Sequence, residues 1–181
     1  IVPRGRALGA AWYLPEERQI TTKEQMLDEM CATLGGRAAE DLFLNRISTG
    51  AMNDLERVTK QAYGMIAYLG MSDKLPNLCY YNNEEYSFNR PYSEKTAELI
   101  DTEVKNMVNE QYERAKKILS EHREGHNQLA QLLIDKEVIF AEDVERIFGK
   151  RPWASRSEEI MAAKESQEAA EAEKRLAEEV K

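Results

Sequence analysis

The chain has 181 residues, 33 of them acidic and 25 basic, which gives a formal net charge of -8. A nucleic-acid groove needs a basic stripe that releases counterions from phosphates, and the sequence offers none, so we expect no nucleic-acid partner. No apolar run approaches the ~20 residues of a membrane helix, and no signal peptide is visible, so we expect this stretch to be soluble.

The only substantial β pattern lies in residues 1–14. Apolar and aromatic residues alternate there with glycines and prolines, and Pro15 closes the run. This pattern predicts a small strand pair at the N-terminus. The chain opens on Ile1 rather than on Met and enters the extended segment at once, so we expect it to derive from a longer protein.

Helical periodicity follows over most of the remaining chain. Thr21 and Thr22 offer capping boxes for a helix that begins near Lys23. The Gly35-Gly36 pair interrupts good helix formers, and it indicates either a break or a place where another helix approaches too closely for side chains. A loop over residues 45–51 then leads to a second helix over about residues 52–69.

An irregular segment over residues 70–91 precedes the C-terminal helices. Ser93 is placed to cap a long helix with a narrow apolar stripe, and two shorter helices follow, the last ending at Gly149. We therefore predict a mainly α-helical domain over residues 1–153. Residues 154–181 are rich in Ala, Glu and Lys with few apolar side chains, which is typical of an acidic, solvated tail.

Two pairs of residues could in principle bind a metal. His122 and His126 are four residues apart, but Arg123 stands where H-E-x-x-H requires a glutamate, and the surroundings are charged. We favour an exposed pair over half of a metal site. Cys31 and Cys79 lie in unrelated contexts, which favours structural thiols over a disulfide or a metal site.

The segment from residue 48 to residue 55 reads Ser-Thr-Gly-Ala-Met-Asn-Asp-Leu, a loop that runs into a helix. Taken alone, Asn53 or Asp54 near the start of that helix is ordinary capping, and spacing alone favours this interpretation. A carboxylate in a first helical turn is also suited to bind a cation, because the helix dipole favours its ionised form.

Several segments, in order, resemble FtsH-type ATP-dependent zinc metalloproteases. They cover about residues 1–153. Residues 5–16 are similar to the family's strand after the zinc-binding helix, and residues 34–43 to its glycine-pair helix. Residues 48–55 are similar to its S-T-G-A-x-N-D-[LI] segment, and residues 68–72 to the helix exit after it. Residues 93–149 are similar to its C-terminal helices.

The resemblance implies a helical peptidase domain with a zinc site of two histidines and an aspartate, which aligns with Asp54. The histidines and the general-base glutamate belong to an H-E-x-x-H helix that would lie upstream of Ile1, so this sequence holds no catalytic residue. We expect the chain alone to be inactive and to bind no zinc. The edge strand that pairs with the substrate backbone matches five residues: Gly9, Ala10, Ala11, Trp12 and Tyr13.

For the full-length protein, the resemblance implies metal-assisted hydrolysis of unfolded polypeptides or membrane proteins. It also implies ATP bound at an ATPase domain outside this sequence, a homo- or hetero-hexamer, and a membrane anchor. The domain would face the bacterial cytoplasm or the mitochondrial matrix. Two alternatives remain: a proteolytically inactive FtsH-like assembly module, and an unrelated helical domain in which Asp54 only caps a helix.

Overall fold

The computed structural model describes residues 20–80, 91–151 and 161–164. They belong to two compact units: one is Ile20–Arg123, and the other contains the described residues from Glu124 onward. Most of the described residues are helical, which confirms a mainly α-helical chain. The strand pair predicted for residues 1–14 lies outside the described residues. No helix in the described part of the chain is both long enough and apolar enough to cross a membrane.

Helix α1 (Lys23–Thr33) begins where the capping signal places it. The Thr22 side chain accepts a hydrogen bond from the Gln25 N–H at 3.3 Å, and Gln25 Oε1 accepts one from the Thr22 N–H at 3.0 Å. Each side chain satisfies a backbone donor that the helix itself leaves unpaired. The predicted capping box at Thr22 is therefore confirmed.

The glycine pair follows a break in the helix. Leu34 separates α1 from α2 (Gly35–Ala39), which continues into a π-helical turn, η1 (Glu40–Leu44). A Cβ atom built on Gly35 or Gly36 would meet no described atom within 4 Å. The break is therefore confirmed, and no described helix packs closely against the two glycines themselves.

Helix α3 (Met52–Tyr63) continues into the π-helical turn η3 (Gly64–Tyr68), which confirms the second predicted helix. Gly70 then adopts a left-handed conformation with φ +59, and a Cβ there would lie 2.9 Å from the Asn77 backbone nitrogen. Only glycine fits this turn without strain. The turn allows an isolated antiparallel bridge between Met71 and Pro76.

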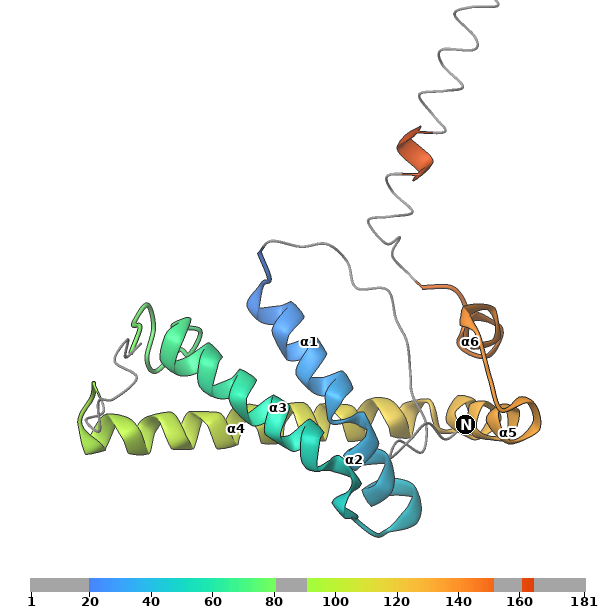
Figure 1. Ribbon diagram of the computed structural model, residues 1–181, viewed down its shortest axis with the longest axis horizontal. Coiled ribbons are helices and arrows are strands. Elements are labelled where there is room, and N and C mark those ends of the chain that lie inside the picture. Colours follow the sequence, from blue (N-terminus) through green and yellow to red (C-terminus); the bar gives the residue numbers. More distant parts are fainter. Residues whose placement is uncertain (1–19, 81–90, 152–160, 165–181) are drawn as a thin grey trace, which may run out of the picture. The chain divides into compact units, whose positions relative to one another are not determined.

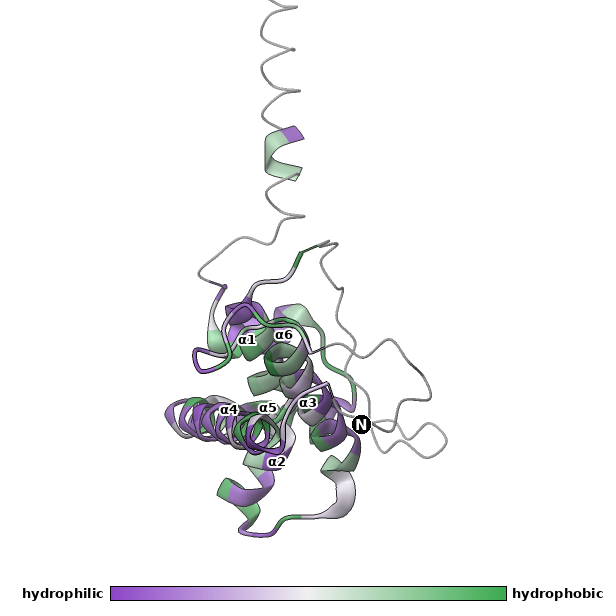
Figure 2. Cartoon of the chain, turned by 90° about the vertical axis from the view of Figure 1, so that its left-hand side faces the viewer, coloured by the Kyte–Doolittle hydropathy of each residue, from purple (hydrophilic) through white to green (hydrophobic). Residues whose placement is uncertain are grey.

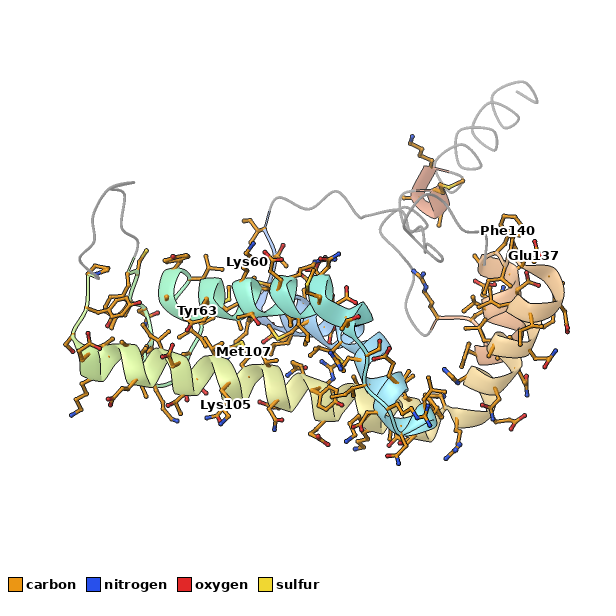
Figure 3. The ribbon with its side chains drawn as sticks, turned by 60° about the horizontal axis from the view of Figure 1, so that its bottom comes forward. Lys60, Tyr63, Lys105, Met107, Glu137 and Phe140 are labelled. Atoms are coloured by element: carbon orange, nitrogen blue, oxygen red, sulfur yellow. The ribbon has the colours of Figure 1, made fainter. Side chains whose placement is uncertain are left out.

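Helix α4 (Glu94–Glu121) starts at the predicted Ser93 cap and forms one wall of the core of its unit. Figure 1 shows α1 and α3 lying across α4, and Figure 2 shows hydrophilic residues on the outward face of α4. Met107 lies on the side of α4 that faces α3, whereas Lys60 lies on the far side of α3 (Figure 3). Among the described residues, this core buries ten: Met30, Leu34, Val58, Ala62, Met65, Ile66, Ala67, Leu75, Ile100 and Val104.

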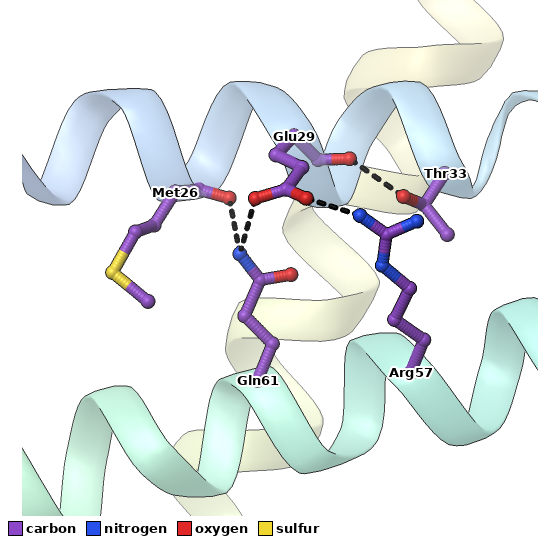
Figure 4. A network of polar contacts seen from close by, with 5 residues as sticks. All are labelled: Met26, Glu29, Thr33, Arg57 and Gln61. Atoms are coloured by element: carbon purple, nitrogen blue, oxygen red, sulfur yellow. Dashed lines mark hydrogen bonds and ion pairs between the residues drawn. The ribbon is translucent and has the colours of Figure 1, made fainter. Parts of the chain in front are cut away.

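A polar network fastens α1 to α3 at the edge of this core (Figure 4). Gln61 Nε2 donates to the Met26 carbonyl at 3.1 Å, and Arg57 forms an ion pair with Glu29. The Thr33 hydroxyl donates to the Glu29 carbonyl at 2.8 Å. The apolar contacts bring α1 and α3 together, and these polar contacts fix how one helix lies along the other.

A second contact holds the glycine-pair helix on α4. Small buried residues, Cys31, Ala38 and Ala115, let α2 lie close to α4, and burial raises the pKa of the Cys31 thiol. In η1, directly after α2, the Asp41 carboxylate accepts a hydrogen bond from the Tyr112 hydroxyl at 2.8 Å and forms an ion pair with Lys116 at 3.1 Å. The segment that carries Glu40 is therefore held on α4.

The second unit contains α5 (Arg123–Lys136) and α6 (Ala141–Phe148), which confirms the helices predicted before Gly149. Asp143 is a residue only 6% exposed. Its carboxylate accepts a hydrogen bond from the Phe140 N–H at 3.2 Å and forms an ion pair with Lys136 at 3.0 Å. These contacts fix the start of α6. Of the predicted acidic tail, the structure describes only residues 161–164, which are helical.

Candidate functional site

The loop before α3 is shaped by its own serine. Ser48 has an extended backbone, and its hydroxyl oxygen accepts a hydrogen bond from the Gly50 N–H at 3.1 Å. This contact caps the short 3-10 turn η2 (Thr49–Ala51), which leads directly into α3 at Met52. The serine and the glycine of this segment therefore act locally, because they set the direction in which α3 starts.

Glu40, the first residue of η1, holds this loop from a distance. One of its carboxylate oxygens accepts a hydrogen bond from the Ser48 N–H at 3.1 Å, and the other accepts one from the Ser48 hydroxyl at 2.5 Å. A single side chain thus fixes both the backbone and the hydroxyl of the residue that caps η2. Because η2 runs without interruption into α3, Glu40 also positions the first turn of α3.

These contacts stabilise the ionised form of Glu40. Hydrogen bonds from the Ser48 hydroxyl and from the Ser48 backbone hold the pKa of the Glu40 carboxyl below its ordinary value, and the charge of Arg37 adds to the effect. Sequence reasoning did not single out Glu40. The only available signal was an acidic residue at the end of the glycine-pair helix, and nothing in the sequence indicates its pairing with Ser48, eight residues later.

Asp54 lies in the first turn of α3, on the element that Glu40 and Ser48 position. Its side chain is partly buried. No side chain caps α3, whose N-cap residue is Ala51, so Asp54 is not the cap that spacing alone favoured. Within the described ranges, the Asp54 carboxylate makes no hydrogen bond or ion pair. It is an anion near the positive end of a helix dipole, with its oxygens available to another group.

The donor atoms of Asp54 fit one ligand of a zinc site and no more. A catalytic zinc takes three protein ligands, usually histidine nitrogens and carboxylate oxygens, and keeps one open position. Residues 20–80, 91–151 and 161–164 contain no group of three His, Cys, Asp or Glu side chains that could hold a metal ion. The described residues therefore do not supply all three ligands of such a site.

The remaining residues that the sequence singled out do not join Asp54 in a described cluster. His122 is the exposed residue that ends α4, and His126 lies partly buried within α5. Cys31 and Cys79 are both free thiols. The predicted edge strand, Gly9 to Tyr13, lies outside the described residues, so its position relative to Asp54 stays a prediction.

Sequence comparisons with known proteins show the family of this chain. Residues 1–147 match the sequence profile of peptidase family M41. The chain is 71% identical over 167 residues to an ATP-dependent zinc metalloprotease FtsH of Parabacteroides distasonis, which covers 91% of the chain and 24% of that protein. It is 47% identical over 156 residues to ATP-dependent zinc metalloprotease FTSH 10, mitochondrial, of Arabidopsis thaliana, with 86% of the chain and 19% of the relative covered.

A mouse protein is also similar. The mitochondrial inner membrane m-AAA protease component AFG3L2 of Mus musculus is 42% identical over 159 residues, which is 87% of the chain and 20% of that protein. The chain thus spans about a quarter or less of the length of the curated relatives described above. The family profile covers Asp54 and also the hydrogen-bonded pair of Glu40 and Ser48, which we call the Glu40–Ser48 clamp. The chain belongs to peptidase family M41.

Proposed function

We propose that this chain is part of an ATP-dependent zinc metalloendopeptidase, in which Asp54 is the acidic zinc ligand. The observation that carries the proposal is the Asp54 carboxylate itself, which lies in the first turn of α3 without capping the helix and without a described partner. The names of the relatives, ATP-dependent zinc metalloproteases, support zinc and ATP for the full-length protein.

In this proposal, each of the described residues has a separate task. Asp54 offers a carboxylate oxygen to the metal, and its place in the first turn puts it near the positive end of the dipole of α3. Glu40 and Ser48 fix the loop that precedes α3, so the direction of the Asp54 side chain is set before any metal binds. Bound zinc would supply Lewis-acid polarisation of the scissile carbonyl and of a water molecule.

The rest of the activity lies outside the described residues. We propose that Gly9 to Tyr13 pair with the backbone of an extended substrate, an unfolded polypeptide or a membrane protein, since main-chain hydrogen bonds read no side chains. We also propose a homo- or hetero-hexamer, with ATP bound at an ATPase domain. We further propose a membrane-anchored full-length protein whose peptidase domain faces the bacterial cytoplasm or the mitochondrial matrix. The name of the mouse relative, a mitochondrial inner membrane protease component, supports the membrane.

The test is the substitution Asp54→Asn in the full-length protein. Asparagine offers a neutral amide oxygen in place of a carboxylate, so zinc content and casein degradation should both fall to background. ATP hydrolysis should continue, because it does not use this ligand. In the 181-residue chain the same change should be mild, because no described hydrogen bond is lost and the helix-dipole term is worth only about 0.3–1 kcal/mol.

Glu56→Gln is the matched control, since Glu56 is an exposed acid on the same helix and, among the described residues, pairs only with Lys60, at 2.5 Å. This variant should degrade casein at the wild-type rate. Normal casein degradation with zinc retained in Asp54→Asn would remove Asp54 from the metal site. If the wild-type full-length protein bound no zinc and degraded no casein, the inactive assembly module would be the correct alternative.

A further inference from the structure

An open groove of about 470 Å³ runs along α4 in the unit formed by Ile20–Arg123. The buried side chains of Leu34 and Val104 form its floor, and Leu55 and Val108, both partly buried, line its sides. Ile47 also lines the groove and remains 67% exposed. The groove therefore offers apolar surface that the described residues leave in contact with water.

Two cations stand at the rim of this groove, Arg37 from α2 and Lys105 from α4. Neither forms an ion pair with any described carboxylate. Other cations of the same unit do form ion pairs, such as Lys74 with Glu103 at 2.7 Å and Lys116 with Asp41 at 3.1 Å.

Arg37 has an acid nearby, and that acid is already engaged. Its charge is close enough to lower the pKa of Glu40, but both oxygens of Glu40 accept hydrogen bonds from Ser48. Lys105 is exposed on α4 (Figure 3), one residue after the buried Val104. Positive charge therefore collects beside the apolar floor, in a chain whose formal net charge is -8.

We propose that this groove binds an amphipathic polypeptide segment that carries apolar side chains on one face and carboxylates beside them. Apolar side chains spaced three or four residues apart fit a groove between helices, as in other helix-in-groove complexes. The carboxylates would pair with Arg37 and Lys105, which gives the groove a preference for acidic over basic segments. The proposal does not depend on zinc or on Asp54, because it concerns binding and not hydrolysis.

The test is direct binding to the 181-residue chain, measured by fluorescence anisotropy. The probe is a fluorescein-labelled synthetic helix of about 14 residues, roughly four turns, with leucines three or four apart and glutamates beside them. A second peptide carries lysines in place of the glutamates. Wild-type chain should bind the glutamate peptide saturably and prefer it to the lysine peptide, and added salt should reduce the preference.

The variant Arg37→Glu, Lys105→Glu should reverse that preference. Exposed ion pairs are weak, so the double variant should bind the glutamate peptide about two- to thirty-fold less tightly than wild type does. Val108→Asp, which puts a charge on the apolar side of the groove, should weaken both peptides. Lys95→Glu is the matched control, because Lys95 is an exposed cation of α4 that does not line the groove, and it should leave the preference unchanged.

Three results would overturn the proposal. The first is no saturable binding of the glutamate peptide to a wild-type chain that is folded by circular dichroism. The second is binding whose preference is the same in wild type and in the folded charge-reversal variant. The third is self-association of the wild-type chain in the ultracentrifuge that Lys105→Glu abolishes while neither peptide binds, since that result would assign the groove to a second copy of the chain.

Discussion

Two glycines in helices should respond in opposite ways to alanine, because their surroundings differ. Around Gly36 in α2, a Cβ atom would meet no described atom within 4 Å. Around Gly125 in α5, a Cβ atom would lie inside van der Waals distance of the Phe148 ring, 2.9 Å from Cζ and closer still to Cε1. The backbone at neither position is left-handed, so alanine is compatible with both conformations.

The expected magnitudes follow from these distances. Gly36→Ala should stabilise the unit formed by Ile20–Arg123 by about 0.5–1 kcal/mol, because alanine loses less backbone entropy than glycine on forming a helix. Gly125→Ala gains the same term but displaces Phe148, and overpacking costs about 1–3 kcal/mol. The net effect at Gly125 should be a loss of up to about 2 kcal/mol. Phe148→Leu should recover part of this loss in the Gly125→Ala background.

The assay is urea denaturation followed by circular dichroism, with native-state hydrogen exchange to assign each change to its unit. A lower free energy of unfolding in Gly36→Ala than in wild type would refute our conclusion that a Cβ atom has space at Gly36. Equal gains at both positions would refute the close contact between Gly125 and Phe148. If Gly36→Ala stabilised the chain but slowed casein degradation by the full-length protein, the need for glycine would arise from a contact outside the described residues.

Three further predictions concern Glu40, the histidines and the tail. The pKa of the Glu40 carboxyl is lowered in the folded chain, so the ionised carboxylate should stabilise the fold above pH 4.5, its ordinary pKa, and this contribution should be lost as the pH falls through the lower pKa of the folded chain. The difference in unfolding free energy between wild type and Glu40→Gln, measured by urea denaturation, should therefore shrink with acidification. A constant difference would argue against the hydrogen bonds between Glu40 and Ser48. His126→Ala should leave the metal content of the chain unchanged in elemental analysis, and loss of stoichiometric zinc would reverse our interpretation of the His122–His126 pair. Deletion of residues 154–181 should leave the melting temperature nearly unchanged, because the tail has few apolar residues to bury; a fall of several degrees would show that the tail packs on the domain.

The contacts that start and stop helices were predictable because they are local. Thr22 and Ser93 each cap a helix through an N–H three residues away, and Gly149 follows α6, as expected. The segment from residue 48 to residue 55 also matches a motif of the family in sequence. That resemblance points to Asp54 as a metal ligand, whereas spacing alone favours a capping role, and the ligand role stays a prediction.

The clamp on that segment was not predictable in the same way. Glu40 and Ser48 are eight residues apart, and they meet only because a π-helical turn and a left-handed residue, Asn45 with φ 49, reverse the chain between them. Capping by Asp54 was the favoured local interpretation, yet Ser48 and Ala51 define the start of the helical segment. The geometry of the loop decided this outcome, and loop geometry depends on contacts that a periodic pattern does not contain.

The amino-acid sequence thus determined the helices, their ends and the family, because capping, periodicity and ordered motifs depend on residues that are near one another in the chain. Only the tertiary structure decided which of the two interpretations of the Gly35-Gly36 pair holds, which acid positions α3, and where apolar surface stays open. The groove beside Arg37 and Lys105 is one example, since each cation is ordinary in its own helix. Their lack of described partners results from how α2, α3 and α4 pack together, and packing is set by the whole core.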